Sequence, residues 1–459
     1  MEMVNDVYKM KGMPVAIDLK KHNQPKRKLN IPKELVPIKN DDTNLIYEIV
    51  AKIGETDILD GKKTMTSGYN TSILGPVIRL RKGQQTRLIA KNQLNESTTF
   101  HWHGLEVAAA NDGGPHHEIM PGQEEILEFN VIQEAGTLWL HPHPHKKTAK
   151  QVYEGLAALI YVEDDNSDQL LIPKDYGIDD IPLIIQDKTF TDDGQLDYQA
   201  DYQADGTLGD TSLINGTINP YVDLTKGLTR LRLLNGSNSR NYRISFSDNI
   251  PFKQIATDGG FLESPVELTE LILTPAERAE IVMDTRQLAV GDTISMLNGD
   301  HALIEFNQVA MPIVTNELPT TLNSIKRLSD EEVAKLPMKE FRLAGMGETV
   351  TINNEKFDMS VINFETKLQS PEVWRIINEP SMMGGMIHPF HVHGTQFQIL
   401  SRNGTPVSGA DKGWKDTVGL LPKETVELLI EFKVPGVFMY HCHNLEHEDN
   451  GMMGQFLVK

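Results

Sequence analysis

The chain has 459 residues, of which 39% are hydrophobic and 24% charged, a composition that supports about three domains with hydrophobic cores. Its formal net charge of -20 at pH 7 argues against nucleic acids and anionic membranes as partners, because both would be repelled. No stretch approaches the ~18 consecutive apolar residues of a membrane-spanning helix, and a single cysteine cannot form an internal disulfide.

The N-terminal stretch, residues 1–28, carries none of the features of an export signal. It has no apolar core, no small-residue cleavage site and no twin arginine. The fold also requires no oxidising compartment, because it cannot rely on a disulfide. The localisation therefore stays open between the cytoplasm and export with the signal already removed.

Short strands dominate the predicted secondary structure. Alternating or β-branched runs recur from LIYEIVAKIG, which starts at residue 45, to TVELLIEFKV, which starts at residue 425, with Gly, Pro, Asn and Asp between them. Helices are expected to be few and short, and one candidate is SDEEVAKL at Ser329. This spacing indicates β-sandwiches or barrels, and hence an all-β fold.

A weak internal repeat divides these strands into three units. A strand ending in Asn, a polar turn and a second strand occur as RLIAKNQLNESTTFHWHG, RLRLLNGSNSRNYRISFS and VWRIINEPSMMGGMIHPFHVHG. We therefore predict domains at residues 1–170, 171–320 and 321–459, the first with an N-terminal arm. The middle domain lacks histidine-rich strands, so we expect it to act mainly as a spacer.

Four His-x-His pairs, two in each outer unit, give the strongest functional signal. Residues i and i+2 of a strand share a face, so each pair can present two imidazoles to a metal. One such pair is more often only hydrogen-bonded, but four pairs in two similar units favour a shared cluster. The paired histidines are His101, His103, His141, His143, His391, His393, His441 and His443.

These imidazoles are too many for one ion and suit three metals, which would share them as two, three and three. Such a cluster would lie between the first and third domains. In HPHPH, His143 can pair with His141 or with His145, and we expect His145 to be the spare one. The remaining histidines lack paired spacing and are expected to be ordinary surface residues: His22, His116, His117 and His301.

The only cysteine, Cys442, would face the opposite side of its strand from the histidines beside it. His447 follows five residues later, Met452 follows ten residues later, and His388 lies upstream in MIHPFHVHG. Two imidazoles, a thiolate and a weak thioether form the trigonal site that selects copper and electron transfer. A lone cysteine is more often buried and inert, but this spacing argues against that alternative. Met453 competes with Met452 for the axial position.

The position of the cysteine also indicates how electrons would move. An electron accepted beside Cys442 would pass through the backbone to His441 and His443, which hold the cluster. Consecutive residues of an extended strand advance roughly 3.3–3.6 Å each, so this covalent path is short.

At these motifs the chain resembles the multicopper oxidases, the family of laccases, bilirubin oxidases and cuprous oxidases. The resemblance begins at about Lys28 and is strongest to the bacterial three-domain branch of copper-efflux oxidases and spore-coat laccases. The residues that carry it are HWHGLEV, NDGGP, WLHPHPH, HPFHVHGTQFQIL, WKDTV and HCHNLEHEDNGMM.

The resemblance implies three cupredoxin-like domains and four copper ions. By motif position, the type 1 copper takes His388, Cys442, His447 and Met452, the type 2 copper takes His101 and His391, and the type 3 pair takes His103, His141, His143, His393, His441 and His443. It also places Asp112 and Glu448 beside the cluster, where they would relay protons as O2 becomes water. Each acid could equally be an ordinary loop or turn residue.

The implied activity is one-electron oxidation of phenols, aromatic amines or metal ions, coupled to four-electron reduction of O2 to water. The partners would be O2 and a small reducing substrate, and we expect a monomer. One alternative is a cuprous oxidase in copper tolerance, although the long Met- and His-rich insert of that branch is absent from residues 340–387. Alternatives of another class are a copper-binding protein without turnover and a metal-free scaffold of the kind found among cell-division relatives.

Two further features have more than one interpretation. Met382, Met383 and Met386 precede His388 and could line the approach of a substrate or equally fill the core. Asp416, in WKDTV, could orient an electron donor, although an aspartate in such a turn is more often structural.

Overall fold

The computed structural model describes residues 19–20, 24–41, 44–200, 202–203, 206–313, 317–380 and 385–459. Strands dominate these ranges, and the longest α-helix in them has 6 residues, which confirms the predicted all-β class. No helix in the same ranges is long and apolar enough to cross a membrane. Residues 1–18 of the stretch without an export signal, His22, Met382 and Met383 lie outside the described residues.

The first group of strands, here called the N-terminal sheets, comprises β2 (Lys39–Asn40), β3 (Asn44–Thr56), β4 (Thr64–Tyr69), β5 (Ile78–Arg81), β6 (Gln85–Gln93), β7 (His101–His103), β8 (Glu124–Asn130), β9 (Gly136–His141) and β10 (Ala158–Glu163). One sheet has the order β2-β3-β6-β8, with β4 paired to β3, and the other has the order β5-β10-β9-β7. The apolar residues of β3 are buried at alternate positions, as a two-sided strand requires.

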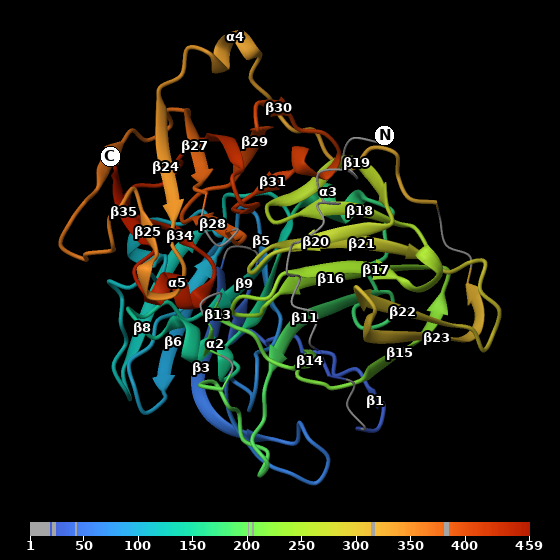
Figure 1. The fold of residues 1–459 in the computed structure, drawn as a ribbon. Coiled ribbons are helices and arrows are strands. Elements are labelled where there is room, and N and C mark those ends of the chain that lie inside the picture. The colour runs from blue at the N-terminus through green and yellow to red at the C-terminus, as the bar shows by residue number, and fades with distance from the viewer. Residues whose placement is uncertain are drawn as a thin grey trace.

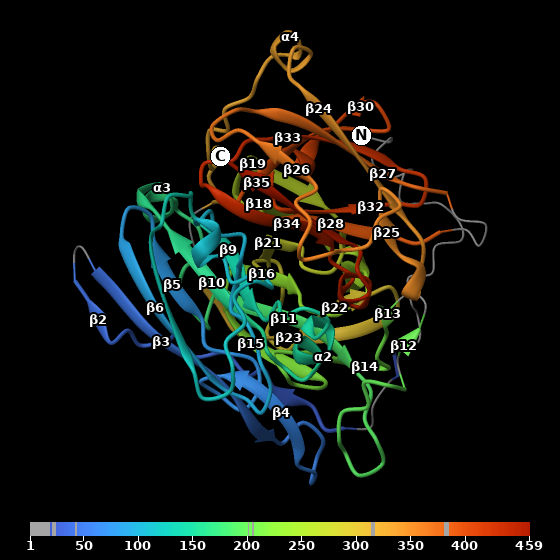
Figure 2. The same cartoon turned by 90° about the vertical axis from the view of Figure 1, so that its left-hand side faces the viewer.

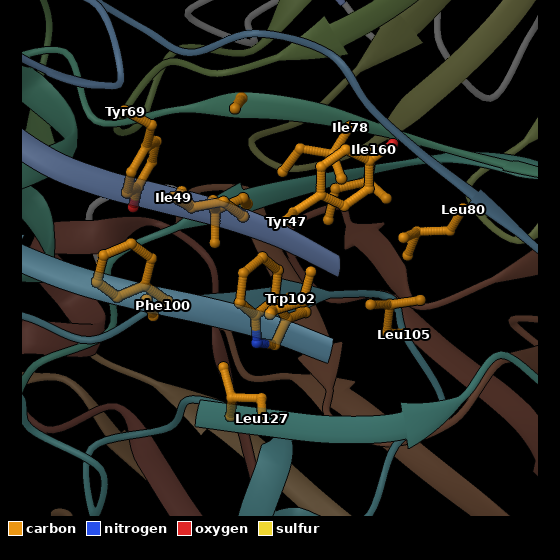
Figure 3. Close-up of a cluster of buried hydrophobic side chains, with 14 of the residues drawn as sticks. Tyr47, Ile49, Tyr69, Ile78, Leu80, Phe100, Trp102, Leu105, Leu127 and Ile160 are labelled. Atoms are coloured by element: carbon orange, nitrogen blue, oxygen red, sulfur yellow. The ribbon is translucent and has the colours of Figure 1, made fainter. Parts of the chain in front are cut away.

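The buried cluster of the N-terminal sheets fixes the orientation of β7. Figure 3 shows Phe100 and Trp102 pointing into this cluster together with Ile49 and Leu127. Since side chains alternate along a strand, His101 faces away from the same core.

The middle sheets comprise β1 (Arg27–Lys28), β11 (Asp180–Lys188), β12 (Tyr202–Gln203), β13 (Gly206–Thr207), β14 (Thr211–Ile214), β15 (Pro220–Lys226), β16 (Leu228–Asn235), β17 (Tyr242–Phe246), β18 (Phe252–Thr257), β19 (Gly260–Leu268), β20 (Glu270–Leu273), β21 (Arg278–Asp284), β22 (Thr293–Asn298) and β23 (His301–Ile313). Their two large sheets have the orders β1-β15-β23-β22-β17-β20 and β14-β11-β16-β21-β18-β19, and β12 pairs with β13. The N-terminal arm thus contributes its strand β1 to a middle sheet, parallel to β15.

The C-terminal sheets comprise β24 (Met338–Ala344), β25 (Thr351–Ile352), β26 (Phe364–Thr366), β27 (Glu372–Asn378), β28 (His388–Val392), β29 (Phe397–Arg402), β30 (Thr405–Pro406), β31 (Trp414–Lys415), β32 (Thr417–Leu420), β33 (Thr425–Ile430), β34 (Gly436–Cys442) and β35 (Met453–Val458). The order of one sheet is β25-β24-β27-β33-β29-β30, with β31 paired to β29. The order of the other is β26-β35-β34-β28-β32.

The described helices are short: α2 (Thr148–Tyr153), α3 (Asp165–Gln169), α4 (Asp330–Val333) and α5 (Leu445–Asp449), with 3-10 turns η1 (Ala109–Asn111), η2 (Ser247–Asn249), η3 (Gly347–Thr349) and η4 (Gly409–Lys412). Helix α4 confirms the helix predicted at Ser329, whose side chain caps it by accepting a bond from the Glu332 amide.

Figures 1 and 2 show three groups of strands, coloured blue to teal, green to yellow and orange to red, which correspond to the three sets of sheets. Helices α5 and α2 lie next to each other in Figure 1, where the three groups meet. Asp449 of α5 accepts hydrogen bonds from the amides of Thr148 and Ala149, at 3.1 and 2.9 Å. Asn238, from the middle sheets, donates to Ala149 O and to Glu446 Oε1, at 2.9 and 2.7 Å.

Candidate metal centre

The histidine pairs lie at the ends of two pairs of adjacent antiparallel strands, and His143, His393 and His443 fall just beyond the last strand residue. In the N-terminal sheets, β7 pairs with β9 and places His101 opposite His141. In the C-terminal sheets, β28 pairs with β34 and places His391 opposite His441. The register of each sheet therefore brings together two histidine motifs that are about 40 to 50 positions apart in the sequence.

Alternation along these strands turns the histidines away from both cores. Phe100 and Trp102 are buried in the core of the N-terminal sheets, and Phe390 and Val392 are buried in the core of the C-terminal sheets. The histidines between these apolar residues face out of their own sheets, towards the other set.

All the paired histidines converge between the N-terminal and C-terminal sheets, and each is at most 1% exposed. Nε2 of His143 is 3.2 Å from Nε2 of His441, and the rings of His103 and His391 stack with their centroids 3.7 Å apart. Each of these contacts joins the N-terminal part of the chain to a strand of the C-terminal sheets, from β7 for His103 and from the segment after β9 for His143. The structure thus brings together the eight histidines that the sequence assigns to one cluster.

Four of the eight rings turn Nε2 towards the centre because Nδ1 is held by a backbone carbonyl. A carbonyl can only accept a hydrogen bond, so Nδ1 carries the ring proton and Nε2 keeps its lone pair. These bonds run from His101 to Asp112 (2.9 Å), from His141 to Pro142 (2.9 Å), from His391 to Asp416 (2.8 Å) and from His441 to Cys442 (3.1 Å).

His103 has the opposite orientation. Its Nε2 lies 2.9 Å from Oδ1 of Asp416, and its Nδ1 lies 3.2 Å from Nε2 of His141. Since a carboxylate accepts and does not donate, Nε2 of His103 carries the proton and Nδ1 is the nitrogen available to the cluster.

The inward-facing nitrogens are well suited to metal ions. Nε2 of His101, Nε2 of His391 and both ring nitrogens of His443 are buried without a hydrogen-bond partner in the described part of the chain. A buried unsatisfied polar atom costs about 1–3 kcal/mol, a cost that a bound cation removes. Three all-histidine groups have ligand atoms within 4.8 Å of one another: His101, His103 and His141; His101, His391 and His393; and His143, His393 and His441.

Burial keeps these imidazoles neutral, which is the form that binds metals. Burial lowers the pKa of His141 and of His143 well below the ordinary value for histidine, and neighbouring rings add to the effect. The pKa of His393 falls to about 4 for the same reasons, although contact with Asp112 partly opposes the shift. At neutral pH these rings are ready to act as ligands.

The second predicted site lies on the opposite face of β34, as strand alternation predicts. Cys442 is buried in the apolar core of the C-terminal sheets, and its Sγ lies 3.9 Å from Nδ1 of His447. The rings of His388 and His447 have centroids 5.4 Å apart. Nδ1 of His388 lies 3.1 Å from Oδ1 of Asn378, while its buried Nε2 has no partner among the described residues.

Met452 lies closer than Met453 to the site formed by Cys442 and His447. Met452 is fully buried in the same apolar core as Cys442. Its carbonyl accepts a hydrogen bond from the Cys442 amide at 3.0 Å, and its amide donates one to His447 O at 2.9 Å. Met453 is instead a residue of β35 that pairs with His441. Burial raises the pKa of the Cys442 thiol, so only a bound cation would hold it as a thiolate at neutral pH.

The two predicted acids both contact cluster histidines. Asp112 Oδ2 lies 2.7 Å from Nδ1 of His393, and Glu448 Oε2 lies 3.2 Å from Nδ1 of His441. Burial alone would raise the pKa of Asp112, but His393 and His101 lower it overall. Burial, reinforced by Asp449, raises the pKa of Glu448 well above its ordinary value. The surroundings therefore shift the pKa values of the two acids in opposite directions.

A cleft of about 380 Å³ extends from the surface to Asp112. It runs between the N-terminal and C-terminal sheets, and apolar side chains line much of it, including Ala109, Val437 and Met439. His116 lines it as well, and its Nε2 lies 2.7 Å from Oε1 of Gln455. Oδ1 of Asp112 is buried without a partner in the described residues.

The other histidines lie outside the cluster. The ring of His145 packs against Phe357, with centroids 5.5 Å apart. His117 lies 3.4 Å from Glu125, and His301 Nε2 lies 3.0 Å from the Ser212 hydroxyl.

Asp416 does not orient a donor molecule at the surface. It is fully buried and contacts His103 instead, so the interpretation as a donor-orienting residue was wrong and the structural alternative was closer. Its partner Arg278, from the middle sheets, was not recognised in the sequence. No short motif links these two positions.

Two family models described as multicopper oxidase match residues 51–167 and 331–459. The multicopper oxidase mco of Staphylococcus aureus is 42% identical over 436 residues, which cover 95% of this chain and 93% of that protein. The solved structure of a laccase from Pediococcus acidilactici Pa5930 has a TM-score of 0.93 at 43% identity, covering 96% of this chain and 95% of that one. The chain belongs to the multicopper oxidase family.

Cell division protein FtsP of Escherichia coli (strain K12) is also similar, at 36% identity over 87% of this chain and 86% of that protein. The predicted family and the all-β fold with cupredoxin-like domains are confirmed. The chain is accordingly a copper-dependent oxidoreductase that uses O2 to accept electrons from a reducing substrate. All the predicted metal ligands fall within the two matched segments, and the middle sheets lie outside both.

Proposed function

We propose that this multicopper oxidase is a laccase-like enzyme that holds four copper ions in two sites, one on each face of β34. The observation that carries the proposal is the arrangement around consecutive residues of this strand. His441 contacts the other cluster imidazoles, while Cys442 lies beside His447 on the opposite face. A protein that only stored copper would have no need for two different donor sets joined by one peptide bond.

The ligand assignment follows the motifs and the contacts. His388, Cys442, His447 and Met452 would hold the type 1 copper. His101 and His391 would hold the type 2 copper. The type 3 pair would be held by His103, His141, His143, His393, His441 and His443. When bound, these ions supply one-electron redox chemistry at the cysteine and a place for O2 to be reduced at the histidines.

The backbone between the sites provides the electron path. From Cys442 it reaches His441 in one direction and His443 in the other, within one residue each. The Cys442 carbonyl also accepts a hydrogen bond from Nδ1 of His441 at 3.1 Å, which adds a second connection. His388 and Cys442 are held in a dry core, so the rigid surroundings limit reorganisation during transfer.

Asp112 and Glu448 would handle the protons that reduction of O2 to water consumes. Asp112 lies at the inner end of the cleft, where its unpartnered Oδ1 can take up a proton from water. Glu448 lies beside His143 and His441, and its raised pKa favours the protonated carboxyl group. The opposite pKa shifts of the two acids support separate roles, one accepting and one donating.

The electron donor would be a phenol, an aromatic amine or a metal ion that docks near His388 and His447. Met386 lies close to this region, since its carbonyl accepts from the side chain of Asn378, which also holds His388. We further propose a monomer with domains at residues 1–170, 171–320 and 321–459.

An experiment with copper-loaded protein tests this function. Copper per chain, the visible spectrum and O2 uptake would be measured with a phenol, an aromatic amine and Cu(I) as donors. We expect four coppers, an intense blue absorption and O2 uptake with the organic donors. Uptake with Cu(I) alone would instead indicate a cuprous oxidase. Blue protein that consumes no O2 with any donor would be a copper-binding protein without turnover.

A further inference from the structure

A buried ion pair between the middle and the C-terminal sheets lies beside the metal centre. The guanidinium of Arg278 binds both carboxylate oxygens of Asp416, with NH1 2.8 Å from Oδ1 and NH2 2.5 Å from Oδ2. Both side chains are fully buried. The middle sheets carry no cluster histidine, but Arg278 brings them into contact with Asp416, which in turn contacts His103.

The position of Arg278 is completely specified by its hydrogen bonds. A guanidinium has five N–H donors in a fixed plane, and here each has an acceptor. Besides the two oxygens of Asp416, Nε donates to the carbonyl of Thr137 at 3.0 Å, NH1 to that of Ala276 at 2.9 Å and NH2 to that of Asp258 at 3.2 Å. These acceptors come from all three sets of sheets.

The carboxylate of Asp416 is equally constrained. Oδ2 also accepts from Nε2 of Gln396 at 2.9 Å, and Oδ1 also accepts from the hydroxyl of Thr417 at 2.9 Å. The remaining donor to Oδ1 is Nε2 of His103, at 2.9 Å. With Arg278 fixing the plane of the carboxylate, Oδ1 is aimed at this ring.

The contact decides which nitrogen of His103 faces the cluster. Nε2 is occupied by Asp416, so Nδ1 is presented, whereas His101 and His141 present Nε2. The carbonyl of the same Asp416 fixes His391 in the usual orientation. One residue therefore orients two ligands that belong to different sets of sheets.

We propose that Arg278 is a positioning residue of the metal centre, which locks Asp416 so that His103 offers Nδ1 to the cluster. The middle sheets are then more than a spacer. The inference rests on the proposed metal centre, because it assumes that His103 is a ligand.

Arg232 offers a matched control. It forms a similar buried, two-pronged pair with Asp180, in which Nε and NH2 each lie 2.7 Å from a carboxylate oxygen. Its other partners are Thr137 and Glu280 rather than a histidine. Arg278→Gln and Arg232→Gln remove comparable buried ion pairs, so a purely structural role predicts the same phenotype for both.

The experiment compares these two variants after copper loading, using copper per chain and the blue absorption. For Arg278→Gln we expect copper to fall from four towards one per chain while the blue absorption is retained. The affinity of the cluster for copper should fall at least about tenfold, as is typical when an outer hydrogen-bond partner of a ligand is lost. Arg232→Gln should keep its full copper content. Full copper in both variants, or parallel loss of copper and colour in both, would overturn the proposal.

A measurement on the metal-free native protein separates this inference from the proposed function and does not depend on how a variant folds. With ¹⁵N-labelled histidine, long-range ¹H–¹⁵N spectra show which ring nitrogen carries the proton. We expect the proton on Nε2 of His103, assigned by the signal lost in His103→Gln, and a changed pattern in Asp416→Asn. A proton on Nδ1 of His103 contradicts the inference even if copper binds. Native protein that binds no copper contradicts the proposed function, whatever the spectrum shows.

Discussion

His391 and His441 are opposite each other on β28 and β34, and Cys442, the next residue after His441, is opposite Phe390 in the core. Two consecutive residues of β34 therefore have different surroundings: His441 faces the cluster of imidazoles, and Cys442 lies in the apolar core. Because successive side chains of a strand point to opposite faces, the two sets of metal ligands stay apart although one peptide bond joins them.

Replacing Cys442 with serine tests this division. The hydroxyl is a poor substitute for a thiolate ligand, so the blue absorption should vanish and O2 uptake with any donor should fall to background. Cluster copper should remain, because the Cys442 side chain lies in the apolar core, on the face of β34 opposite the paired rings. A copper assay combined with the visible spectrum checks both parts. A Cys442→Ser protein that stays blue would remove the assignment of this site.

The proton role of Asp112 is testable with Asp112→Asn. The amide keeps the shape of the side chain but cannot take up a proton from the cleft. The rate of O2 reduction should therefore fall by roughly 10²- to 10⁴-fold, the usual contribution of a positioned acid or base. The blue absorption should be unchanged. Glu118→Gln, an exposed acid of the same loop, is the control. Native turnover in Asp112→Asn would exclude the relay.

Gly114 allows the cleft itself to be blocked. A Cβ added at Gly114 would meet nothing closer than Asp112 Oδ2 at 3.6 Å and Met439 Cγ at 3.9 Å, so alanine should be tolerated. Leucine at this position would project further into the cleft and obstruct the route to Asp112. Gly114→Leu should slow O2 uptake, whereas anaerobic bleaching of the blue absorption by the donor should proceed at the native rate. Equal O2 uptake in Gly114→Leu and Gly114→Ala would show that the cleft is not used.

The metal-free protein should lose stability in acid. The folded-state pKa of His393 is lowered to about 4 and that of His443 to about 3, against about 6.5 when unfolded, mainly by burial. Between the folded and the unfolded pKa, the unfolded chain binds more protons than the folded chain. The free energy of unfolding therefore decreases as the pH falls below ~6.5, by up to about 1.4 kcal/mol per pH unit for each such histidine. Asp449, whose pKa is raised to about 7 by burial, opposes the trend, because its contribution is lost as the pH rises.

The histidines with lowered pKa outnumber the acids with raised pKa in this region, so they should dominate. Urea unfolding of the metal-free protein at a series of pH values should give a free energy of unfolding that rises from pH 4.5 to 6.5. A flat or falling profile over this range would mean that the cluster histidines are not buried as neutral rings.

Much of the site could be predicted because its information is local. The spacing of His101 and His103 within one strand, and of Cys442 between two histidines, specifies the faces through the two-residue period alone. HPHPH alone does not decide between His143 and His145, because the choice depends on the packing of the N-terminal against the C-terminal sheets, which brings His143 to His441.

Contacts between distant segments could not be predicted in the same way. Arg278 and Asp416 are 138 positions apart and meet only because the middle and C-terminal sheets pack together. A lone Arg or Asp in a strand or turn has no periodic pattern that reveals a buried partner. The pairing of β1 with β15 is of the same kind, because a two-residue strand carries too little pattern to show its neighbour.

The most direct test of the two proposed copper sites is X-ray diffraction from a crystal of copper-loaded protein, measured at the copper absorption edge. Anomalous scattering locates each copper without any assumption about the ligands. We expect one peak beside Cys442 Sγ and three peaks enclosed by the eight paired histidines. A map with no peak within bonding distance of that sulfur, or with fewer than three peaks among the histidines, would contradict this expectation.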